Sequence, residues 1–230
     1  MPPLRLAVII PTLNEAATIE STLASLAPWR ARGHAVIVAD GGSADRTVAL
    51  ATPHADRVID APRGRARQMN AGAAACDADA YVFLHADSRL PDDAIAAISA
   101  ALSDARHRWG RFDVNITGRS RWLPVVAAMM NVRSRASGIA TGDQAIFVGR
   151  AAFEQADGFP DWPLMEDIGL SRALKRQSRP AALRLRVTTL GRRWDAEGPL
   201  RTIVLMWWLR LRFFFGARPE RLAARYAAVR

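Results

Sequence analysis

The sequence predicts an α/β protein whose doubly wound sheet is mixed but mostly parallel, with flanking helices and a C-terminal amphipathic helical tail. Over residues 1–105, short apolar runs alternate with segments of helical spacing, which is typical of a parallel sheet. The run at residues 81–84 is apolar throughout, as in a strand buried on both faces. With half of its 230 residues apolar, the chain is expected to form one large domain or a domain with an appendage.

The first expected strand covers residues 6–10 and stops at Pro11, because proline cannot continue a central ladder. Thr12 or Asn14 is expected to cap a helix, with Glu15 favourably placed in its first turn. Capping alone explains these polar residues as well as a binding role does.

The second expected strand, residues 35–39, is followed by Asp40, Gly41 and Gly42. The glycines permit a tight turn and a close approach of the backbone to a ligand. Ser43 is expected to cap the next helix, and Asp40 stands where an acidic residue contacts a base or ribose in dinucleotide folds. The motif is weak evidence by itself, since many turns have this composition.

A third short strand at residues 57–59 precedes a helix over residues 64–76. Arg63, Arg65 and Arg67 fall near the start of that helix, where its dipole disfavours positive charge. This local cost indicates that they face an anion such as a diphosphate. The alternative is a solvated arginine face.

The fourth expected strand, residues 81–87, ends in His85, Ala86 and Asp87. The carboxyl ends of parallel strands open into the crevice in which α/β proteins bind their ligands. A carboxylate at that position can hold a divalent metal against a substrate phosphate. The alternative is an aspartate that caps the next helix.

The second half is expected to hold strands at residues 109–116, 145–148 and 183–190, the last at an edge of the sheet. Glu166 and Asp167 form an acidic pair at the start of a helix, where the helix dipole favours acidic residues in any case. In a functional interpretation, one carboxylate is a general base and its neighbour orients substrate or structure.

The net charge of +10 is unevenly spread, with 9 basic and 12 acidic residues over 1–105 but 23 basic and 10 acidic residues over 106–230. A basic half needs an anionic neighbour, such as a membrane surface, a phosphorylated substrate or nucleic acid. The Trp and Phe residues after Leu200 cluster with arginines in one apolar helix. That pattern is typical of a helix in the membrane interface and not of stacking platforms for nucleic acid.

The alternative for this tail is docking on the core of the protein. Residues 122–132 form a second apolar stretch, expected to cover a cleft or touch lipid, and both stretches are too short to cross a bilayer. The single cysteine, Cys76, excludes an internal disulfide, and no signal peptide is evident. We therefore expect a cytoplasmic protein that is peripheral on the inner face of the membrane.

Taken together, these motifs resemble the family 2 glycosyltransferases of the GT-A fold over about residues 5–195. Residues 8–15 resemble the family's first nucleotide-binding loop and residues 40–45 its second. His85 to Asp87 stand in the place of the Asp-x-Asp metal motif. Glu166 and Asp167 resemble the acidic pair that supplies the base for the acceptor.

The resemblance implies a GT-A-like domain over residues 1–195, with a nucleotide-binding half (1–105) and an acceptor half (106–195), followed by a basic amphipathic tail (196–230). It implies inverting transfer of a hexosyl group from a nucleotide-diphosphate sugar to an acceptor hydroxyl. Mn²⁺ or Mg²⁺ would be held by Asp87, and Asp167 or, less readily, Glu166 would be the base. The implied nucleotide-binding residues are Pro11, Thr12, Asn14, Glu15, Asp40, Gly41, Gly42, Arg65, Arg67, Asn70, His85, Ala86 and Asp87. The implied acceptor or donor-sugar region comprises Gly142, Asp143, Gln144, Arg193 and Trp194.

A narrower resemblance is to the radical-SAM/selenodomain-associated transferase family 2, carried by residues 84–88, 142–144, 163–167 and 192–194. The chain departs from the wider family at His85, which replaces the first acidic residue of Asp-x-Asp. We therefore expect Asp87 alone to hold the metal, while His85 faces the ribose or diphosphate. The Gln-x-x-Arg-Trp motif of processive synthases is reduced to its last two residues, which argues against polymer synthesis.

Two other classes of protein remain open. A sugar-nucleotide nucleotidyltransferase shares the α/β sheet, but its glycine-rich phosphate loop should follow the first strand, and residues 11–15 contain no glycine. A non-catalytic, membrane-associated protein that binds nucleotide sugars would keep the fold without transfer. For the acceptor, the apolar stretches favour a lipid or lipid-linked molecule.

Overall fold

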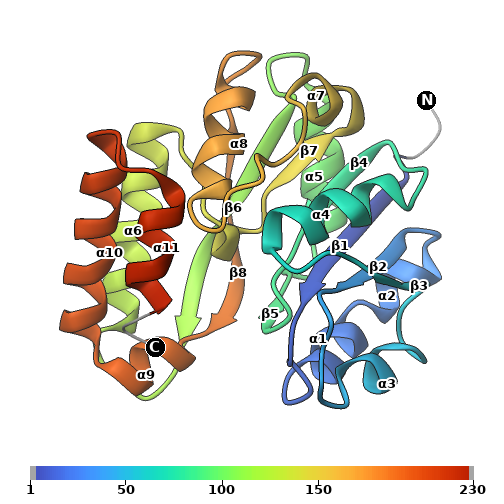
Figure 1. Ribbon diagram of the computed structural model, residues 1–230. Helices are drawn as coiled ribbons and strands as arrows, with labels where there is room; N and C mark the ends of the chain where they lie inside the picture. The colour runs from blue at the N-terminus through green and yellow to red at the C-terminus, as the bar shows by residue number, and fades with distance from the viewer. Residues whose placement is uncertain (1–3, 228–230) are drawn as a thin grey trace.

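The computed structural model describes residues 4–227 and, within them, all side chains except those of residues 193, 196, 197, 199, 200 and 227. The strands are β1 (Leu6–Thr12), β2 (Ala35–Asp40), β3 (Arg57–Asp60), β4 (Ala80–Phe83), β5 (Ser88–Arg89), β6 (Trp109–Thr117), β7 (Phe147–Gly149) and β8 (Ala181–Leu190). In the described part of the chain they form one eight-stranded sheet of order β3-β2-β1-β4-β7-β6-β8-β5 (Figure 1). The predicted α/β class with a mixed, mostly parallel sheet is confirmed.

Helices cover this sheet on both sides (Figure 1). They are α1 (Ile19–Ser25), α2 (Ala27–Ala31), α3 (Thr47–Ala51), α4 (Arg65–Ala74), α5 (Ala94–Ser103), α6 (Leu123–Ser137), α7 (Arg150–Gln155), α8 (Glu166–Lys175), α9 (Arg192–Glu197), α10 (Pro199–Phe214) and α11 (Pro219–Ala227). A short 3-10 turn, η1 (Gly142–Gln144), precedes β7.

The first half of the chain, residues 1–105, follows the predicted alternation, with β1, β2, β3 and β4 paired in parallel. Successive residues of β1 enter opposite cores: Ile10 packs on one face of the sheet and Ile9 on the other, and both are fully buried. Helix α4 lies so close to β1 that a Cβ on Gly72 would come within 2.4 Å of Ile9 Cγ2. Burial on both faces therefore explains the continuous apolar runs in the sequence.

The loops after β1 and β2 differ from the prediction. Pro11 lies inside β1, where it is tolerated because the pairing with β4 stops at Ile9. Helix α1 starts only at Ile19, so Thr12 and Asn14 do not cap it. The predicted cap at Ser43 is also wrong, because α3 begins only at Thr47, and the Ser43 hydroxyl instead accepts a hydrogen bond from Asn14 N (2.8 Å). Hydrogen bonds between the two loops thus replace the expected helix caps.

The predicted edge position of β8 is also wrong. β8 lies between β6, with which it is parallel, and the two-residue strand β5, with which it is antiparallel. A strand as short as Ser88–Arg89 leaves no periodic pattern in the sequence. Its pairing brings Thr189 to Ser88 and thereby next to Asp87, which positions one wall of the site described below.

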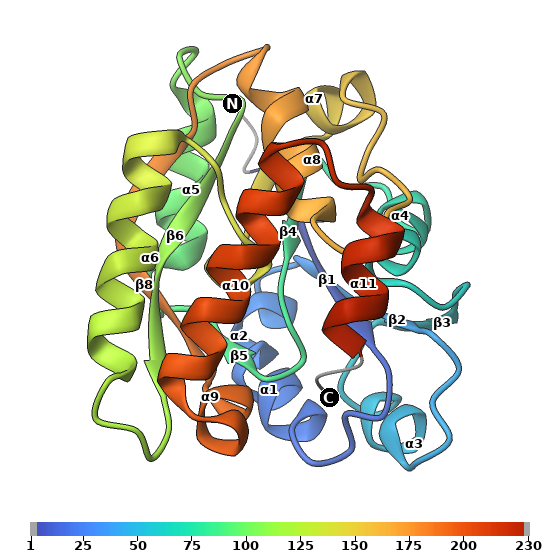
Figure 2. The same ribbon diagram turned by 60° about the vertical axis from the view of Figure 1, so that its left-hand side comes forward.

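The tail docks on the body of the protein through one face of α10. Leu209 and Phe213 of α10 and Leu222 of α11 are buried in a cluster with Met165 and Ile168. Figure 2 shows α10 between α6 and α11. The docking alternative for the tail therefore holds for this face. None of the helices in the described part of the chain is long and apolar enough to span a membrane.

Candidate functional site

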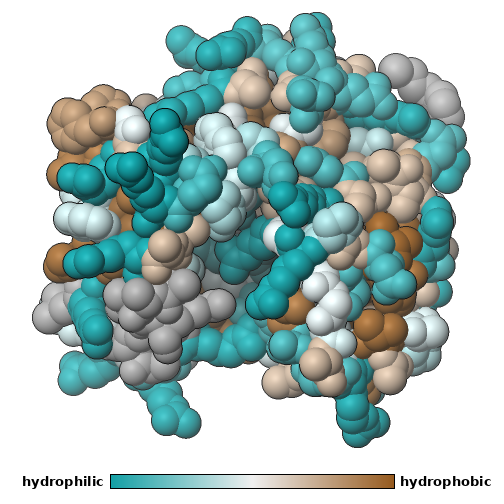
Figure 3. All heavy atoms as spheres, in the orientation of Figure 1, coloured by the Kyte–Doolittle hydropathy of each residue, from teal (hydrophilic) through white to brown (hydrophobic). Residues whose placement is uncertain are grey.

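A cleft of about 860 Å³ opens where β1 and β4 end, and the tail helix α10 forms part of its wall. Figure 3 shows a hollow with hydrophilic residues near the centre of that face of the molecule. The predicted site residues that line the cleft are Pro11, Asn14, Glu15, Arg65, His85, Ala86, Asp87, Gly142, Asp143, Glu166, Asp167 and Trp194. Residues from the two halves of the sequence thus meet in one cavity.

Other predicted residues do not line this cavity: Thr12, Asp40, Gly41, Gly42, Arg67, Asn70 and Gln144. The side chain of Arg193 lies outside the described residues. Gln144 is fully buried, and its Oε1 accepts a hydrogen bond from the backbone N–H of Thr141 (3.2 Å), so it shapes the turn beside the cleft.

The carboxylate of Asp40 is hydrogen-bonded within its own loop and to the end of β1. Its carboxylate accepts hydrogen bonds from Thr12 Oγ1 (3.0 Å), Ser43 Oγ (2.6 Å), Ser43 N (2.7 Å) and Gly42 N (3.0 Å). Only 2% of the residue is exposed. In this conformation Asp40 stabilises the turn after β2, and its contact with a nucleotide base stays a prediction.

Arg67 and Asn70 bind the loop before α8 and not the cleft. Arg67 Nε donates to Asp161 (2.7 Å) at the surface, and this ion pair raises the pKa of Arg67. Asn70 donates to Phe159 O (2.8 Å) and accepts from Phe159 N (2.9 Å). Of the two arginines assigned to a nucleotide, Arg65 alone lines the cleft.

Asp87 is held by partners that are distant in the sequence. Arg192 Nη2 lies 2.9 Å from Asp87 Oδ2 and 2.8 Å from Glu15 Oε2, so one guanidinium joins two cleft carboxylates. Thr189 Oγ1 donates to Asp87 Oδ1 (3.3 Å). Sequence reasoning missed Arg192 and Thr189, although Arg192 immediately precedes the Arg-Trp pair that it did select.

His85 lies over η1. Its Nδ1 is 3.2 Å from Asp143 Oδ1, and a Cβ on Gly142 would come within 2.4 Å of its Nε2, so only glycine leaves room for the imidazole. Burial raises the pKa of Asp143. The hydrogen bond and charge of His85, together with the charges of Arg65 and Arg210, lower it by more, so the pKa is below its usual value. Asp143 is thus held as a carboxylate beside His85.

Glu166 and Asp167 begin α8 after a turn at Met165. Met165 has a φ of 69°, a left-handed conformation that non-glycine residues seldom adopt, and its burial beneath α10 and α11 holds it there. Asp167 accepts hydrogen bonds from Ile168 N (2.7 Å) and Gly142 N (3.2 Å). Burial and the neighbouring charge of Asp167 raise the pKa of Glu166. The pair therefore divides into a backbone-bound carboxylate and a buried carboxyl group with raised proton affinity.

A metal would find few ligands of its own in this cleft. The described residues contain no group of three or more His, Cys, Asp or Glu side chains that could hold a metal ion. His85 is engaged with Asp143, so the carboxylate that a metal could use after β4 is that of Asp87, which it would share with Arg192. One carboxylate fits Mg²⁺ or Mn²⁺ when substrate phosphates and water supply the other ligands.

Comparison with known proteins identifies relatives of this fold. A sequence model described as glycosyl transferase family 2 matches residues 7–161. No sequence match was found among curated proteins.

Among solved structures, similarity was found to TarS from S. aureus, with 16% identity, a TM-score of 0.66, and coverage of 81% of this chain and 60% of that chain. The mannosyltransferase PcManGT from Pyrobaculum calidifontis in complex with GDP-Man and Mn²⁺ has 20% identity and a TM-score of 0.66, covering 98% of this chain and 70% of that one. Glucosyl-3-phosphoglycerate synthase from Mycobacterium tuberculosis with Mn²⁺, UDP and phosphoglyceric acid has 21% identity and a TM-score of 0.58, covering 81% and 69%. These similarities show a GT-A-like fold, and the chain spans 60% of the TarS chain.

Proposed function

The chain belongs to glycosyl transferase family 2, and we propose that it transfers a hexosyl group from a nucleotide-diphosphate sugar to an acceptor hydroxyl. The observation that carries the proposal is the meeting of Glu15, Asp87 and Asp167 in one cleft at the end of β4. Relatives of the same fold were solved with UDP-GlcNAc, GDP-Man and UDP, which supports a donor of this class. The narrower radical-SAM-associated subgroup stays a prediction from the motifs.

The donor would lie along the ends of β1 and β4. Asn14 and Glu15, in the loop after β1, line one part of the cleft. Arg65 is the cation of α4 that lines the cleft. We assign the base and ribose to the first loop and the diphosphate to Asp87 and Arg65.

A divalent cation, Mn²⁺ or Mg²⁺, belongs to this proposal, with Asp87 as its protein ligand. When bound, such an ion stabilises the negative charge on the departing nucleoside diphosphate as a Lewis acid. Arg192 already contacts the Oδ2 atom of Asp87 and therefore competes with a metal for it. Mn²⁺ and Mg²⁺ in complexes of relatives support a divalent ion.

In the reaction, Asp167 would accept the proton of the acceptor hydroxyl as its oxygen attacks the anomeric carbon. The bond from that carbon to the diphosphate breaks, and its electron pair leaves with the nucleoside diphosphate. A single displacement of this kind inverts the anomeric configuration. Glu166 is the alternative base, but its raised pKa and 7% exposure suit a supporting position beside Arg65.

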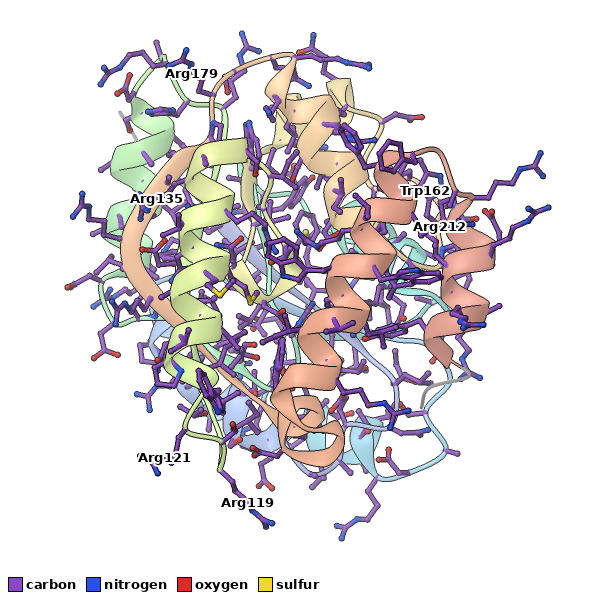
Figure 4. The ribbon with its side chains drawn as sticks, turned by 90° about the vertical axis from the view of Figure 1, so that its left-hand side faces the viewer. Arg119, Arg121, Arg135, Trp162, Arg179 and Arg212 are labelled. Atoms are coloured by element: carbon purple, nitrogen blue, oxygen red, sulfur yellow. The ribbon has the colours of Figure 1, made fainter. Side chains whose placement is uncertain are left out.

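From the outer faces of α6 and α10 we infer that the protein contacts an anionic membrane surface and acts on a lipid-linked acceptor. The large exposed apolar side chains on these helices and at their ends are Trp122, Val125, Met129, Val132, Val204, Trp207, Trp208, Leu211, Phe214 and Phe215, of which Met129 and Trp207 also border the cleft. They recur every three to four residues, so each helix presents an apolar stripe. In Figure 4, which faces these helices, Arg119 and Arg121 extend outward below α6 and Arg212 lies on α10. Exposed apolar side chains with arginines nearby suit a membrane interface.

The test of the proposed reaction is incubation with nucleotide-diphosphate sugars and Mn²⁺, followed by analysis of the nucleotide released. Release of nucleoside diphosphate supports glycosyl transfer, whereas conversion of the donor to a nucleoside triphosphate and a sugar 1-phosphate when pyrophosphate is added would identify a nucleotidyltransferase. Thermal unfolding in nucleoside diphosphates measures donor binding separately, since a ligand at 100 times its dissociation constant adds ~2.7 kcal/mol to stability. Stabilisation without turnover, with any donor and acceptor, would favour the non-catalytic alternative.

A further inference from the structure

Two arginines from different parts of the chain line the same wall of the cleft. Arg133 comes from α6 and Arg210 from the tail helix α10. Neither forms an ion pair with a carboxylate that the structure describes within residues 4–227. Their neighbours behave differently: Arg135 lies 2.8 Å from Asp113, and Arg192 joins Asp87 and Glu15.

Arg133 is half-buried, and part of its guanidinium group lacks partners. Its Nε and Nη2 atoms are inaccessible to solvent and have no hydrogen-bond acceptor among the described residues. A buried guanidinium N–H that is left unpaired is unfavourable, because it has lost water and gained nothing in return. Burial, with the nearby charge of Arg210, lowers the pKa of Arg133 to about 10, and burial also lowers that of Arg210. Both side chains stay charged at neutral pH, and no described carboxylate lies within ion-pair distance of either.

We propose that Arg133 and Arg210 bind a phosphate group carried by the acceptor, beside the hydroxyl that Asp167 deprotonates. This inference rests on the proposed function, of which it names the acceptor class. A guanidinium offers a planar pair of N–H donors that matches two phosphate oxygens. A phosphate would provide the acceptors that Nε and Nη2 of Arg133 lack, and its charge would oppose the repulsion between the two arginines.

The location favours the acceptor over the donor diphosphate. Asp167 and Asp143 are the carboxylates with the largest electrostatic effect on both arginines, ahead of Asp87 and Glu15 on the donor side. The same wall carries Met129 on α6 and Met206 and Trp207 on α10. A phosphate on an apolar chain would fit these neighbours, and so would a small phosphorylated molecule.

Calorimetric titration of the full-length protein with inorganic phosphate, with UDP or GDP and Mn²⁺ present to saturate the donor side, tests the site. We expect Arg133→Gln and Arg210→Gln each to weaken phosphate binding at least tenfold, while Arg212→Gln, an exposed arginine on the same helix, leaves it unchanged. Equal phosphate affinity in wild type and both cleft variants, or no phosphate binding at all, would overturn the proposal.

Donor binding is measured on the same variants by nucleoside diphosphate titration. We expect it to be retained, so a parallel loss of nucleotide and phosphate affinity would reassign the arginines to the donor and overturn the acceptor site. If wild type binds phosphate at Arg133 and Arg210 but no nucleotide, the proposed function fails and the anion site stands. Titration with dodecyl phosphate identifies the source: tenfold tighter binding than inorganic phosphate indicates a lipid phosphate, and equal binding indicates a soluble one.

Arg133→Met guards against a trivial folding defect. An unbranched apolar side chain that follows the stem of arginine removes the unpaired buried N–H groups, so we expect the melting temperature of this variant in phosphate-free buffer to equal or exceed that of wild type. A large decrease in the melting temperature would mean that Arg133 is a structural residue and would overturn its assignment as an anion ligand.

Discussion

Arg192 Nη2 lies 2.9 Å from Asp87 Oδ2 and 2.8 Å from Glu15 Oε2, so a single guanidinium occupies the carboxylate oxygen on which the proposed metal depends. The arginine is 105 residues from Asp87 in the sequence and reaches it from the start of α9. Without bound donor, this contact relieves the repulsion between two carboxylates. When a metal and diphosphate bind, the metal and the guanidinium of Arg192 would compete for the carboxylate of Asp87.

Substitution of Arg192 should therefore increase the affinity of the protein for the metal. We expect Arg192→Gln to lower the Mn²⁺ concentration for half-maximal activity by about three- to tenfold, which is the loss of one partly exposed charge-assisted hydrogen bond. Arg201→Gln, at an exposed position of α10, is the matched control. If Arg192→Gln lost activity at every Mn²⁺ concentration, Arg192 would be the cation that the reaction uses.

Asp167 should be required for transfer and not for donor binding. Asp167→Asn keeps the shape of the side chain, and its amide oxygen still accepts from the N–H of Ile168, but it cannot take a proton. We expect a loss of ~10²–10⁴ in the transfer rate, with the same nucleotide-induced stabilisation as wild type. Glu166→Gln is the comparison, and a larger loss there than in Asp167→Asn would exchange the roles of the two residues.

The exposed apolar stripe on α10 should be necessary for membrane binding. Leu211 and Phe214 are 56% and 73% exposed and do not line the cleft, so replacing both with serine removes apolar surface without disturbing the buried Leu209 and Phe213. We expect sedimentation with vesicles rich in anionic lipid to fall several-fold, while Val48→Ser, an exposed position on α3, has no effect. Unchanged sedimentation of the double variant would remove this surface from the proposal. Deleting the whole tail is a poorer test, because α10 also forms a wall of the cleft.

Local patterns in the sequence were sufficient to predict the buried strands and the polar groups at their ends. The same patterns could not predict which polar residue faces the cleft. Arg65 and Arg67 are about 200° apart around a helix that turns 100° per residue, so when Arg65 lines the cleft, Arg67 must point elsewhere. Asp40 stands in a sequence motif that is typical of ligand contacts, but its carboxylate accepts hydrogen bonds from the hydroxyl groups of Thr12 and Ser43.

Contacts between distant segments were beyond local reasoning for a different reason. Arg192 and Thr189 reach Asp87 because β5 pairs antiparallel with β8. A strand of two residues is too short to be predicted from the sequence, so this pairing could not be predicted either. The tail was ambiguous because α10 is apolar on both sides: Leu209 and Phe213 face the core while Trp207 faces outward. A sequence with apolar residues around a helix is compatible with core docking and membrane contact together.

Gly142 should be irreplaceable because of His85. Alanine at this position would put its Cβ 2.4 Å from His85 Nε2, so the imidazole or the turn must move. We expect Gly142→Ala to cost about 1–3 kcal/mol of folding free energy, as overpacking does. Gly149→Ala is the control, since its Cβ meets an atom no closer than 3.6 Å. The double variant Gly142→Ala/His85→Ala should recover most of the loss in denaturant unfolding. No recovery would mean that backbone strain, and not the imidazole, is responsible.

Glu166 should make the protein less stable as the pH rises. Its pKa is raised in the folded state by burial and by Asp167, from an ordinary value of 4.5 in the unfolded chain. Between those two values the folded state binds more protons than the unfolded state, so stability falls as the pH increases through this interval and stays lower above it. Each tenfold increase in proton affinity corresponds to about 1.4 kcal/mol.

Glu166→Gln removes this effect because the amide does not ionise. We expect the variant to melt at a higher temperature than wild type at pH 8, with the difference shrinking towards zero as the pH falls to 4. Asp161→Asn provides the opposite sign, since the ion pair with Arg67 lowers the pKa of Asp161 at the surface. A difference between Glu166→Gln and wild type that does not change with pH would show that Glu166 stays ionised in the folded protein, held by Arg65. The carboxylate would then be available as the base, which would return the choice between Glu166 and Asp167 to the kinetic comparison of their amide variants.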